Sequence, residues 1–211
     1  QVIFDHNGTI DKYVGDMVMA FWNAPLKDQR HAYNAILAAL AMQKMSEGLR
    51  HDFAAAGFPE VNIGIGVNTG PMNVGDMGSN FRRAYTVLGD SVNLGSRLES
   101  VTKFYGVKIL VGESSYAQAP EFLYRRVDSI VVKGKSEPVT VYEPVCLLSE
   151  ASASRKARVS QFNEAVGYYC AQQWDASADI LRELLAQDPE RKLYQLYLER
   201  IASLRDTDLG V

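Results

Sequence analysis

The sequence predicts an α+β protein, a mixed α/β sandwich with a small all-α extension at its C-terminal end. Short runs of β-forming residues alternate along the chain with longer segments that have apolar residues at helical spacing. Near residue 150 the composition changes, and beyond it only helical patterns remain. The chain has 211 residues and is 47% hydrophobic, which is enough for a well-buried core.

The first part of the chain predicts a helix end followed by a hairpin. Residues 1–4 have the character of a last helical turn, and two β-rich runs within residues 8–22 flank a turn at Gly15. Asp28 can cap the next predicted helix, which has an apolar stripe. The stripe consists of Tyr33, Ile36, Leu37 and Leu40. We therefore expect this helix to cover a sheet.

A strand with one bare face is predicted at residues 61–68. Aliphatic side chains at the odd positions alternate with Asn and Gly at the even positions. Because a bare face admits a closely approaching neighbour, we expect another part of the structure to pack tightly there. A turn-rich segment at 70–79 leads to a strand at 83–88, and a helix at 92–104 follows the turn at 89–91. Further strands are predicted at 108–111, 124–132 and 139–144.

The chain divides into a domain at residues 1–148, a linker at 149–160 and a helical extension at 161–211. Ser, Ala and Arg replace the strand formers in the linker. The extension contains three amphipathic patterns and a helix start at Asp188-Pro189, and it resembles a single tetratricopeptide repeat. Since one repeat cannot bury its own apolar face, we expect the extension to dock on the first domain or on chain outside this sequence.

Charge and composition exclude several classes of partner. The formal net charge is -3 with scattered basic residues, so we expect no nucleic-acid partner. Cys146 and Cys170 have neither disulfide-scaffold nor metal-site spacing, which favours a reducing, cytoplasmic location. No apolar run approaches the roughly 20 residues of a membrane helix, so no membrane contact is expected here. The chain starts without Met inside a helix pattern, and we expect it to be part of a longer protein, which could itself be membrane-anchored.

Three segments carry a family resemblance: KYVGDMVMAFW at 12–22, YTVLGDSVNLGSRLES at 85–100 and VKGKSEPVTVYE at 132–143. In this order they resemble class III adenylyl and guanylyl cyclases, and the resemblance covers residues 1–145. It implies the palm-type, ferredoxin-like cyclase fold. It also implies attack of the ribose 3'-oxygen on the α-phosphorus of a nucleoside triphosphate, assisted by two Mg²⁺ or Mn²⁺ ions per site.

In this resemblance Asp16 matches one of two metal-binding aspartates. Carboxylate oxygen suits Mg²⁺ or Mn²⁺, which take further ligands from substrate phosphates and water. The alternative is an Asp that only forms the turn after Gly15. The second metal aspartate belongs to an upstream strand motif of the type FxDIxGFT, which this sequence lacks.

Lys12 and Thr86 match the positions that read the base. Guanylyl cyclases carry Glu and Cys there, whereas a Lys can donate to a ring nitrogen of adenine and a Thr hydroxyl can accept from its amino group. The resemblance therefore implies ATP as the substrate. The alternative is a solvated strand lysine and an ordinary β-forming threonine.

Asn93 and Arg97 lie four residues apart, and hence on one face of the predicted helix. In the family these positions bind the ribose and stabilise the transition state, a role that suits the planar guanidinium. The alternative is a surface Arg97 paired with Asp90 or Glu99.

Lys133 matches a lysine that contacts the triphosphate, with Lys135 as an adjacent candidate; both could instead be solvated. The family arranges its sites across a two-fold axis, so a homodimer with two shared sites is implied. The bare strand face at 61–68 fits the close approach of such a second copy, which we expect to pack there. The expected function is adenylate cyclase, forming 3',5'-cyclic AMP and pyrophosphate in signalling. Three alternatives remain: a guanylate cyclase, an inactive cyclase-like domain that binds nucleotide and regulates a partner, and a scaffold built around the extension.

Overall fold

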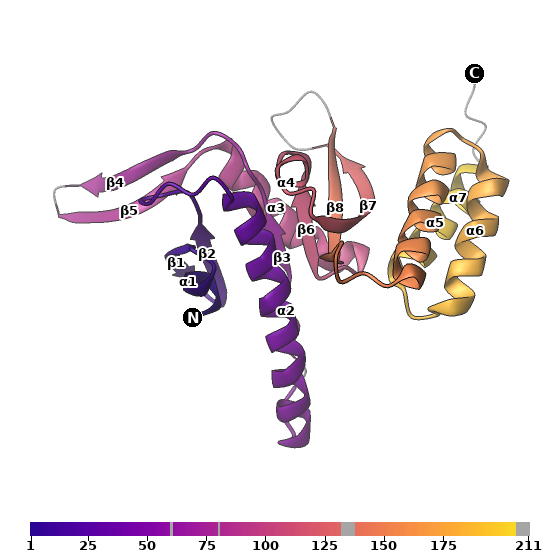
Figure 1. Ribbon diagram of the computed structural model, residues 1–211, viewed down its shortest axis with the longest axis horizontal. Helices are drawn as coiled ribbons and strands as arrows, with labels where there is room; N and C mark the ends of the chain where they lie inside the picture. Colours follow the sequence, from indigo (N-terminus) through magenta and orange to yellow (C-terminus); the bar gives the residue numbers. More distant parts are fainter. Residues whose placement is uncertain (60, 80, 132–137, 206–211) are drawn as a thin grey trace.

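The computed structural model describes residues 1–59, 61–79, 81–131 and 138–205, and it has the predicted mixed α/β architecture (Figure 1). The largest sheet of these residues has the strand order β3-β6-β8-β7. β3 (Ile65–Val67) pairs in parallel with β6 (Ile109–Gly112). β8 (Val139–Leu147) pairs antiparallel with both β6 and β7 (Phe122–Ile130). The three strands predicted after residue 105 are thus confirmed.

Two hairpins lie outside this sheet. β1 (Thr9–Val14) and β2 (Met17–Phe21) form the predicted hairpin, and Gly15 occupies its turn with φ of 62°. β4 (Asn73–Ser79) and β5 (Arg82–Leu88) form the second one. Figure 1 shows it projecting from the central sheet, on the side away from the C-terminal helices. The prediction of turns at 70–79 is wrong, because this polar, Gly-containing segment becomes a strand by pairing with β5.

The short helix α1 (Val2–Asp5) precedes β1, and the long helix α2 (His31–Ala55), which follows β2, covers one face of the sheet. Ile36 is fully buried, in a cluster that includes Ile109 and Val111 of β6. Asp28 does not cap α2, which begins three residues later, but its carboxylate accepts a hydrogen bond from the Arg30 N–H at 2.8 Å. No helix among the described residues is both long and apolar enough to span a bilayer.

The bare face of β3 is covered by α3 (Asp90–Tyr105) of the same chain. A Cβ atom on Gly66 would lie 2.1 Å from the Gly95 carbonyl oxygen and 2.4 Å from the Glu99 nitrogen. The expectation that a second copy packs on this face is therefore wrong. The strand is also shorter than the predicted 61–68, since residues 61–64 lie outside any strand.

Three helices form the C-terminal extension: α5 (Ala153–Cys170), α6 (Trp174–Gln187) and α7 (Lys192–Arg205). α5 begins inside the predicted linker, so the linker prediction of 149–160 is wrong for most of its length. The Ser152 hydroxyl caps α5 by accepting from the Arg155 N–H at 3.2 Å. Polar Ser and Arg side chains in this stretch therefore mark a cap and the exposed first turns of a helix. The likeness to a tetratricopeptide repeat stays a prediction.

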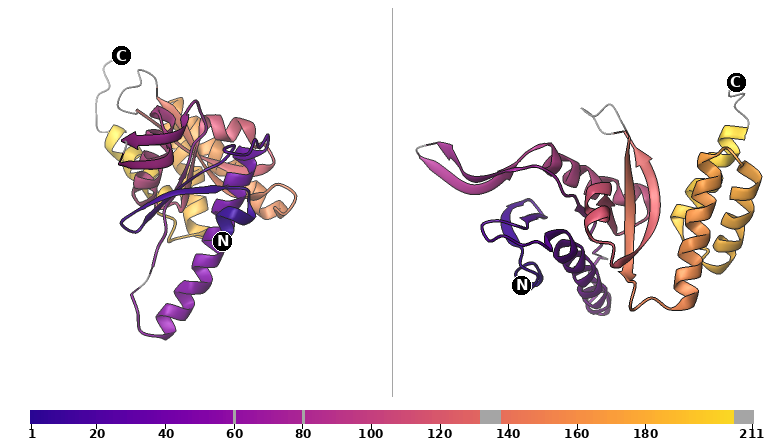
Figure 2. Two further views of the ribbon diagram at one scale, coloured as in Figure 1. Left: turned by 90° about the vertical axis from the view of Figure 1, so that its left-hand side faces the viewer. Right: turned by 45° about the horizontal axis from the view of Figure 1, so that its top comes forward.

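The extension docks on the sheet, as the sequence analysis expected. Phe162, Leu181 and Tyr197 of the extension share one buried cluster with Val127 of β7 and Leu98 of α3. The Tyr197 hydroxyl also donates to the Val127 carbonyl oxygen at 2.8 Å. Figure 2 shows the three helices beside β7 and β8. α4 (Glu113–Gln118) completes the fold between β6 and β7.

Candidate functional site

The predicted site residues lie on three neighbouring elements of the chain. Lys12 is on β1 and Asp16 in the turn that follows it. Thr86 is on β5, and Asn93 and Arg97 are on α3, which follows β5 directly. Lys133 and its alternative Lys135 lie outside the described residues.

Lys12 and Thr86 meet at a residue that the sequence analysis missed, Asp11. The Thr86 hydroxyl donates to Asp11 Oδ2 at 2.6 Å, and the Val87 N–H lies 3.5 Å from the same oxygen. Lys12 Nζ lies 3.6 Å from Asp11 Oδ1. The Asp11 side chain is only 1% exposed, whereas that of Lys12 is 43% exposed. One buried carboxylate thus joins the two residues expected to read the base.

Asp16 occupies an exposed position in the β1–β2 turn, where Gly15 supplies the left-handed backbone conformation. Within the described part of the chain, its carboxylate takes part in no hydrogen bond or ion pair. The carboxylate is therefore available to a cation, for which its hard oxygens are suitable ligands. The described residues contain no group of three or more His, Cys, Asp or Glu side chains that could hold a metal. Asp16 would supply only part of a metal site.

α3 holds Asn93 and Arg97 by packing its other face into the core. Leu94 and Leu98 are buried, while Asn93 is exposed and Arg97 is half-buried. The Asn68 side chain, at the end of β3, donates to the Ser91 carbonyl oxygen at 2.9 Å and fixes the first turn of α3. The two predicted residues therefore project from a helix whose position is set by β3.

Large apolar side chains are exposed on both hairpins. On the first hairpin these are Tyr13, Val14 and Val18; on the second they are Phe81, Tyr85 and Leu88. Phe81 is fully exposed, and Tyr13, next to Lys12, is 69% exposed. Apolar groups of this size beside a polar site are typical of an interaction surface.

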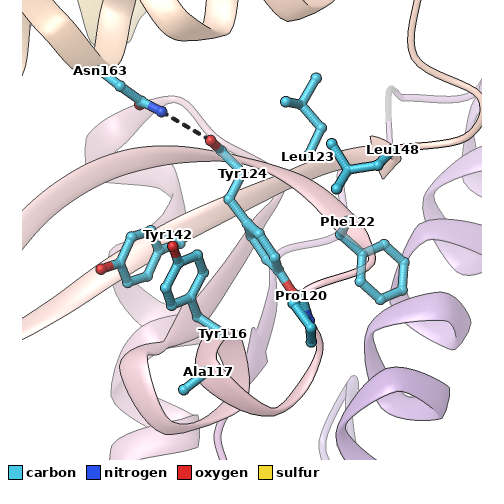
Figure 3. Close-up of a pocket in the computed structure, with 9 residues that line it drawn as sticks. All are labelled: Tyr116, Ala117, Pro120, Phe122, Leu123, Tyr124, Tyr142, Leu148 and Asn163. Carbon is cyan, nitrogen blue, oxygen red and sulfur yellow. Dashed lines mark hydrogen bonds between the residues drawn. The ribbon is translucent and has the colours of Figure 1, made fainter.

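Two cavities of the described chain lie away from these residues. One, of about 380 Å³, is lined by aromatic residues of α4, β7 and β8, and Figure 3 shows Tyr116 stacked on Tyr142 in its wall. A second, of about 560 Å³, lies between α2, β8 and the extension. Neither is lined by a predicted site residue. Lys12, Asp16 and Asn93 are exposed, so the candidate site is open to solvent in a single chain.

Comparison with known proteins places this arrangement in a family. A family model described as the Adenylate and Guanylate cyclase catalytic domain matches residues 5–143. Adenylate cyclase 1 of Rhizobium meliloti (strain 1021) is 38% identical over 146 residues, which are 69% of this chain and 22% of that protein. The chain thus spans under a quarter of that curated relative's length.

Two crystal structures are similar to the chain. The adenylyl cyclase CyaB from P. aeruginosa is 34% identical with a TM-score of 0.63, covering 72% of this chain and 78% of that one. The guanylyl cyclase Cya2 is 28% identical with a TM-score of 0.64, covering 72% of this chain and 76% of that one. They confirm the predicted palm-type fold. Because the family model matches more than half of its residues, the chain belongs to the adenylate and guanylate cyclase catalytic domain family.

Proposed function

We propose that this chain is the catalytic domain of an adenylate cyclase, which converts ATP to 3',5'-cyclic AMP and pyrophosphate. The observation that carries the proposal is the meeting of Lys12 and Thr86 at Asp11, which supports their assignment as the base-reading pair, with Lys and Thr in place of Glu and Cys. The similarity to proteins named adenylate cyclase supports it.

In the proposed reaction each described residue has a distinct task. Lys12 donates to a ring nitrogen of adenine, and Thr86 accepts from the adenine amino group. Asn93 holds the ribose. The 3'-hydroxyl gives its proton to water, its oxygen bonds to the α-phosphorus, and the bond from that phosphorus to the α,β-bridging oxygen breaks, so that pyrophosphate leaves with that oxygen. Arg97 stabilises the charge on the phosphoryl oxygens in the transition state with its planar guanidinium.

Asp16 would hold metal in this reaction, since its exposed carboxylate has no competing partner among the described residues. Two Mg²⁺ or Mn²⁺ ions, when bound, would neutralise charge on the phosphates and activate the attacking oxygen. The further ligands would come from the substrate and from a second aspartate outside this sequence. Lys133 is proposed to contact the triphosphate.

The proposed active form is a homodimer with two sites, each formed by Asp16 of one protomer and by Lys12, Asn93 and Arg97 of the other. The exposed apolar side chains on both hairpins support this arrangement, because they lie on the same hairpins as Lys12, Asp16 and Thr86 and would be buried by a partner. With the site open in one chain, a second chain would also exclude water from it.

The direct test is product formation by the full-length protein, with ATP or GTP and Mn²⁺, followed by chromatography of the nucleotides. We expect cyclic AMP from ATP and little cyclic GMP from GTP. A preference for GTP would make the chain a guanylate cyclase. Nucleotide binding without either product would instead favour an inactive regulatory domain.

A further inference from the structure

The Thr86 hydroxyl donates a hydrogen bond to Asp11, and we propose that Asp11 is thereby a positioning residue for base selection. The inference rests on the proposed function and extends it. Thr86 Oγ1 has one proton and two lone pairs, and the 2.6 Å hydrogen bond commits the proton to Asp11 Oδ2. Toward any other group Thr86 therefore acts only as an acceptor.

A β-bulge brings Asp11 to this position. β1 and β2 pair as Ile10 with Ala20 and then as Lys12 with Met19, so Asp11 is an extra residue without a partner on β2. In a regular strand, side chains at successive positions point to opposite faces. A bulge breaks this alternation and redirects one side chain, and bulges are frequent beside active sites. Here the Asp11 carboxylate is close to both Lys12 and Thr86.

Burial makes the Asp11 carboxylate a dependable acceptor. With a side chain 1% exposed, it exchanges little with water and relies on two donors, the Thr86 hydroxyl and the Val87 N–H, and on the Lys12 ammonium group as an ion-pair partner at 3.6 Å. A buried carboxylate that lost such a donor would be left unsatisfied at considerable cost in free energy. The Thr86 hydroxyl is therefore held in one orientation before any nucleotide arrives.

The resulting pattern of hydrogen-bond donor and acceptor at Lys12 and Thr86 matches the edge of adenine. Lys12 is a donor only and Thr86 is now an acceptor only. Adenine presents an acceptor at ring nitrogen N1 and a donor at its 6-amino group, so both contacts are satisfied. Guanine presents the opposite order, with N1–H as a donor and the 6-oxygen as an acceptor. A free Thr86 hydroxyl could donate to that oxygen, whereas one committed to Asp11 cannot.

The test is the ratio of kcat/KM for ATP to kcat/KM for GTP in the full-length protein carrying Asp11→Asn. The Asn amide can donate to Thr86 Oγ1 and so release the Thr86 proton toward the base. We expect the ATP-to-GTP ratio to fall about tenfold. Asp52→Asn on the exposed surface of α2 makes the same change in charge and should leave the ratio unaltered.

The same substitution in a protein without the Thr86 hydroxyl shows whether Asp11 acts through Thr86. In protein that already carries Thr86→Val, which has no hydroxyl, Asp11→Asn should change the ratio no further. An equal change with and without the Thr86 hydroxyl would overturn the proposal, and so would an unchanged ratio in a folded Asp11→Asn protein.

The inference can still be decided if the Asp11→Asn protein does not fold or if the wild-type protein is inactive. Should Asp11→Asn fail to fold by circular dichroism, Thr86→Val alone must lower the ATP-to-GTP ratio, and an unaltered ratio would refute the inference. Should wild-type protein form neither product, the proposed function fails by itself. The ratio of ATP to GTP dissociation constants, measured by calorimetry on the same variants, then decides the inference.

Discussion

Single buried carboxylates connect the C-terminal helices to the sheet. Asp128 on β7 accepts hydrogen bonds from the Tyr105 hydroxyl at 2.7 Å and from Arg200 Nη1 at 2.8 Å. Burial, and then the neighbouring Asp128 carboxylate, raise the pKa of Tyr105, so its hydroxyl remains a donor at neutral pH. Glu143 on β8 is shared in the same way by Arg125 on β7 and Arg191 just before α7.

Glu143→Gln should destabilise the protein by about 3 kcal/mol at neutral pH, because it leaves two largely buried arginines without their counter-charge. Burial alone would raise the pKa of Glu143, but the charges of Arg125 and Arg191 outweigh it and lower that pKa below its usual value of 4.5. The stabilisation is thus complete above pH 4.5 and is lost as the pH falls through the lower, folded-state pKa. Urea unfolding of the wild-type and Glu143→Gln proteins, from neutral pH to below pH 4.5, measures this difference in unfolding free energy.

Glu47→Gln is the matched control for this prediction. The hydrogen bond from Lys108 is the first cause that lowers the pKa of Glu47, but that pair is exposed to solvent. The substitution should cost less than about 0.5 kcal/mol. Equal losses for Glu47→Gln and Glu143→Gln would contradict the argument from burial.

Base choice is also decided by single residues. Lys12→Glu combined with Thr86→Cys should depress ATP use and raise GTP use, because the remaining polar groups would no longer match adenine. The ATP-to-GTP ratio of kcat/KM should fall by about a hundredfold or more. Lys44→Glu, the same charge reversal on the surface of α2, should leave that ratio unchanged. If the double variant also kept the wild-type ratio, neither residue would contact the base.

At the scale of elements, the contact of β3 with α3 sets the position of the proposed catalytic helix. Gly66→Ala would push a methyl group into the α3 backbone, which cannot yield as a flexible side chain would. We expect a loss of about 1–3 kcal/mol in unfolding free energy. A displaced α3 would also lower kcat by up to about a hundredfold, since Asn93 and Arg97 move with it. Urea unfolding and cyclic AMP formation measure the two effects.

Gly48→Ala on α2 is the matched control for that substitution. A Cβ atom there meets nothing within 4 Å, and Gly48 lies inside a helix. The change should stabilise the protein by about 0.5–1 kcal/mol through the lower backbone entropy of the unfolded chain. A loss of stability at Gly48 similar to that at Gly66 would mean that steric contact with α3 is not the cause.

For the molecule as a whole, the proposed shared site can be tested by mixing inactive proteins. Asp16→Asn and Arg97→Ala homodimers should each be nearly inactive. In a mixed dimer one pocket combines the intact Asp16 with the intact Arg97, while the other pocket carries both changes. Random exchange makes about half of the dimers mixed, so activity should return to about a quarter of wild type. No recovery despite verified subunit exchange would show that the pocket lies within one chain.

The sequence by itself determined the family, the order of most elements and the candidate residues. Short-range patterns carried this information: alternation for the strands, helical spacing for α2, the turn at 89–91 for the start of α3, and three motifs whose residues are close together in the chain. Lys12 and Asp16 belong to one hairpin, and Asn93 and Arg97 share one helix face, so sequence spacing alone predicts that each pair is close together within a chain.

Only the tertiary structure decided which distant segments meet. The strand β4 exists because β5 pairs with it, the bare face of β3 belongs to α3, and α5 begins where a linker was expected because it docks on β7. Asp11 was missed because a bulge, which depends on the register of β1 against β2, redirects its side chain toward Thr86 on another hairpin. Register and long-range packing depend on free energies summed over many contacts, and no local pattern around residue 11 records them.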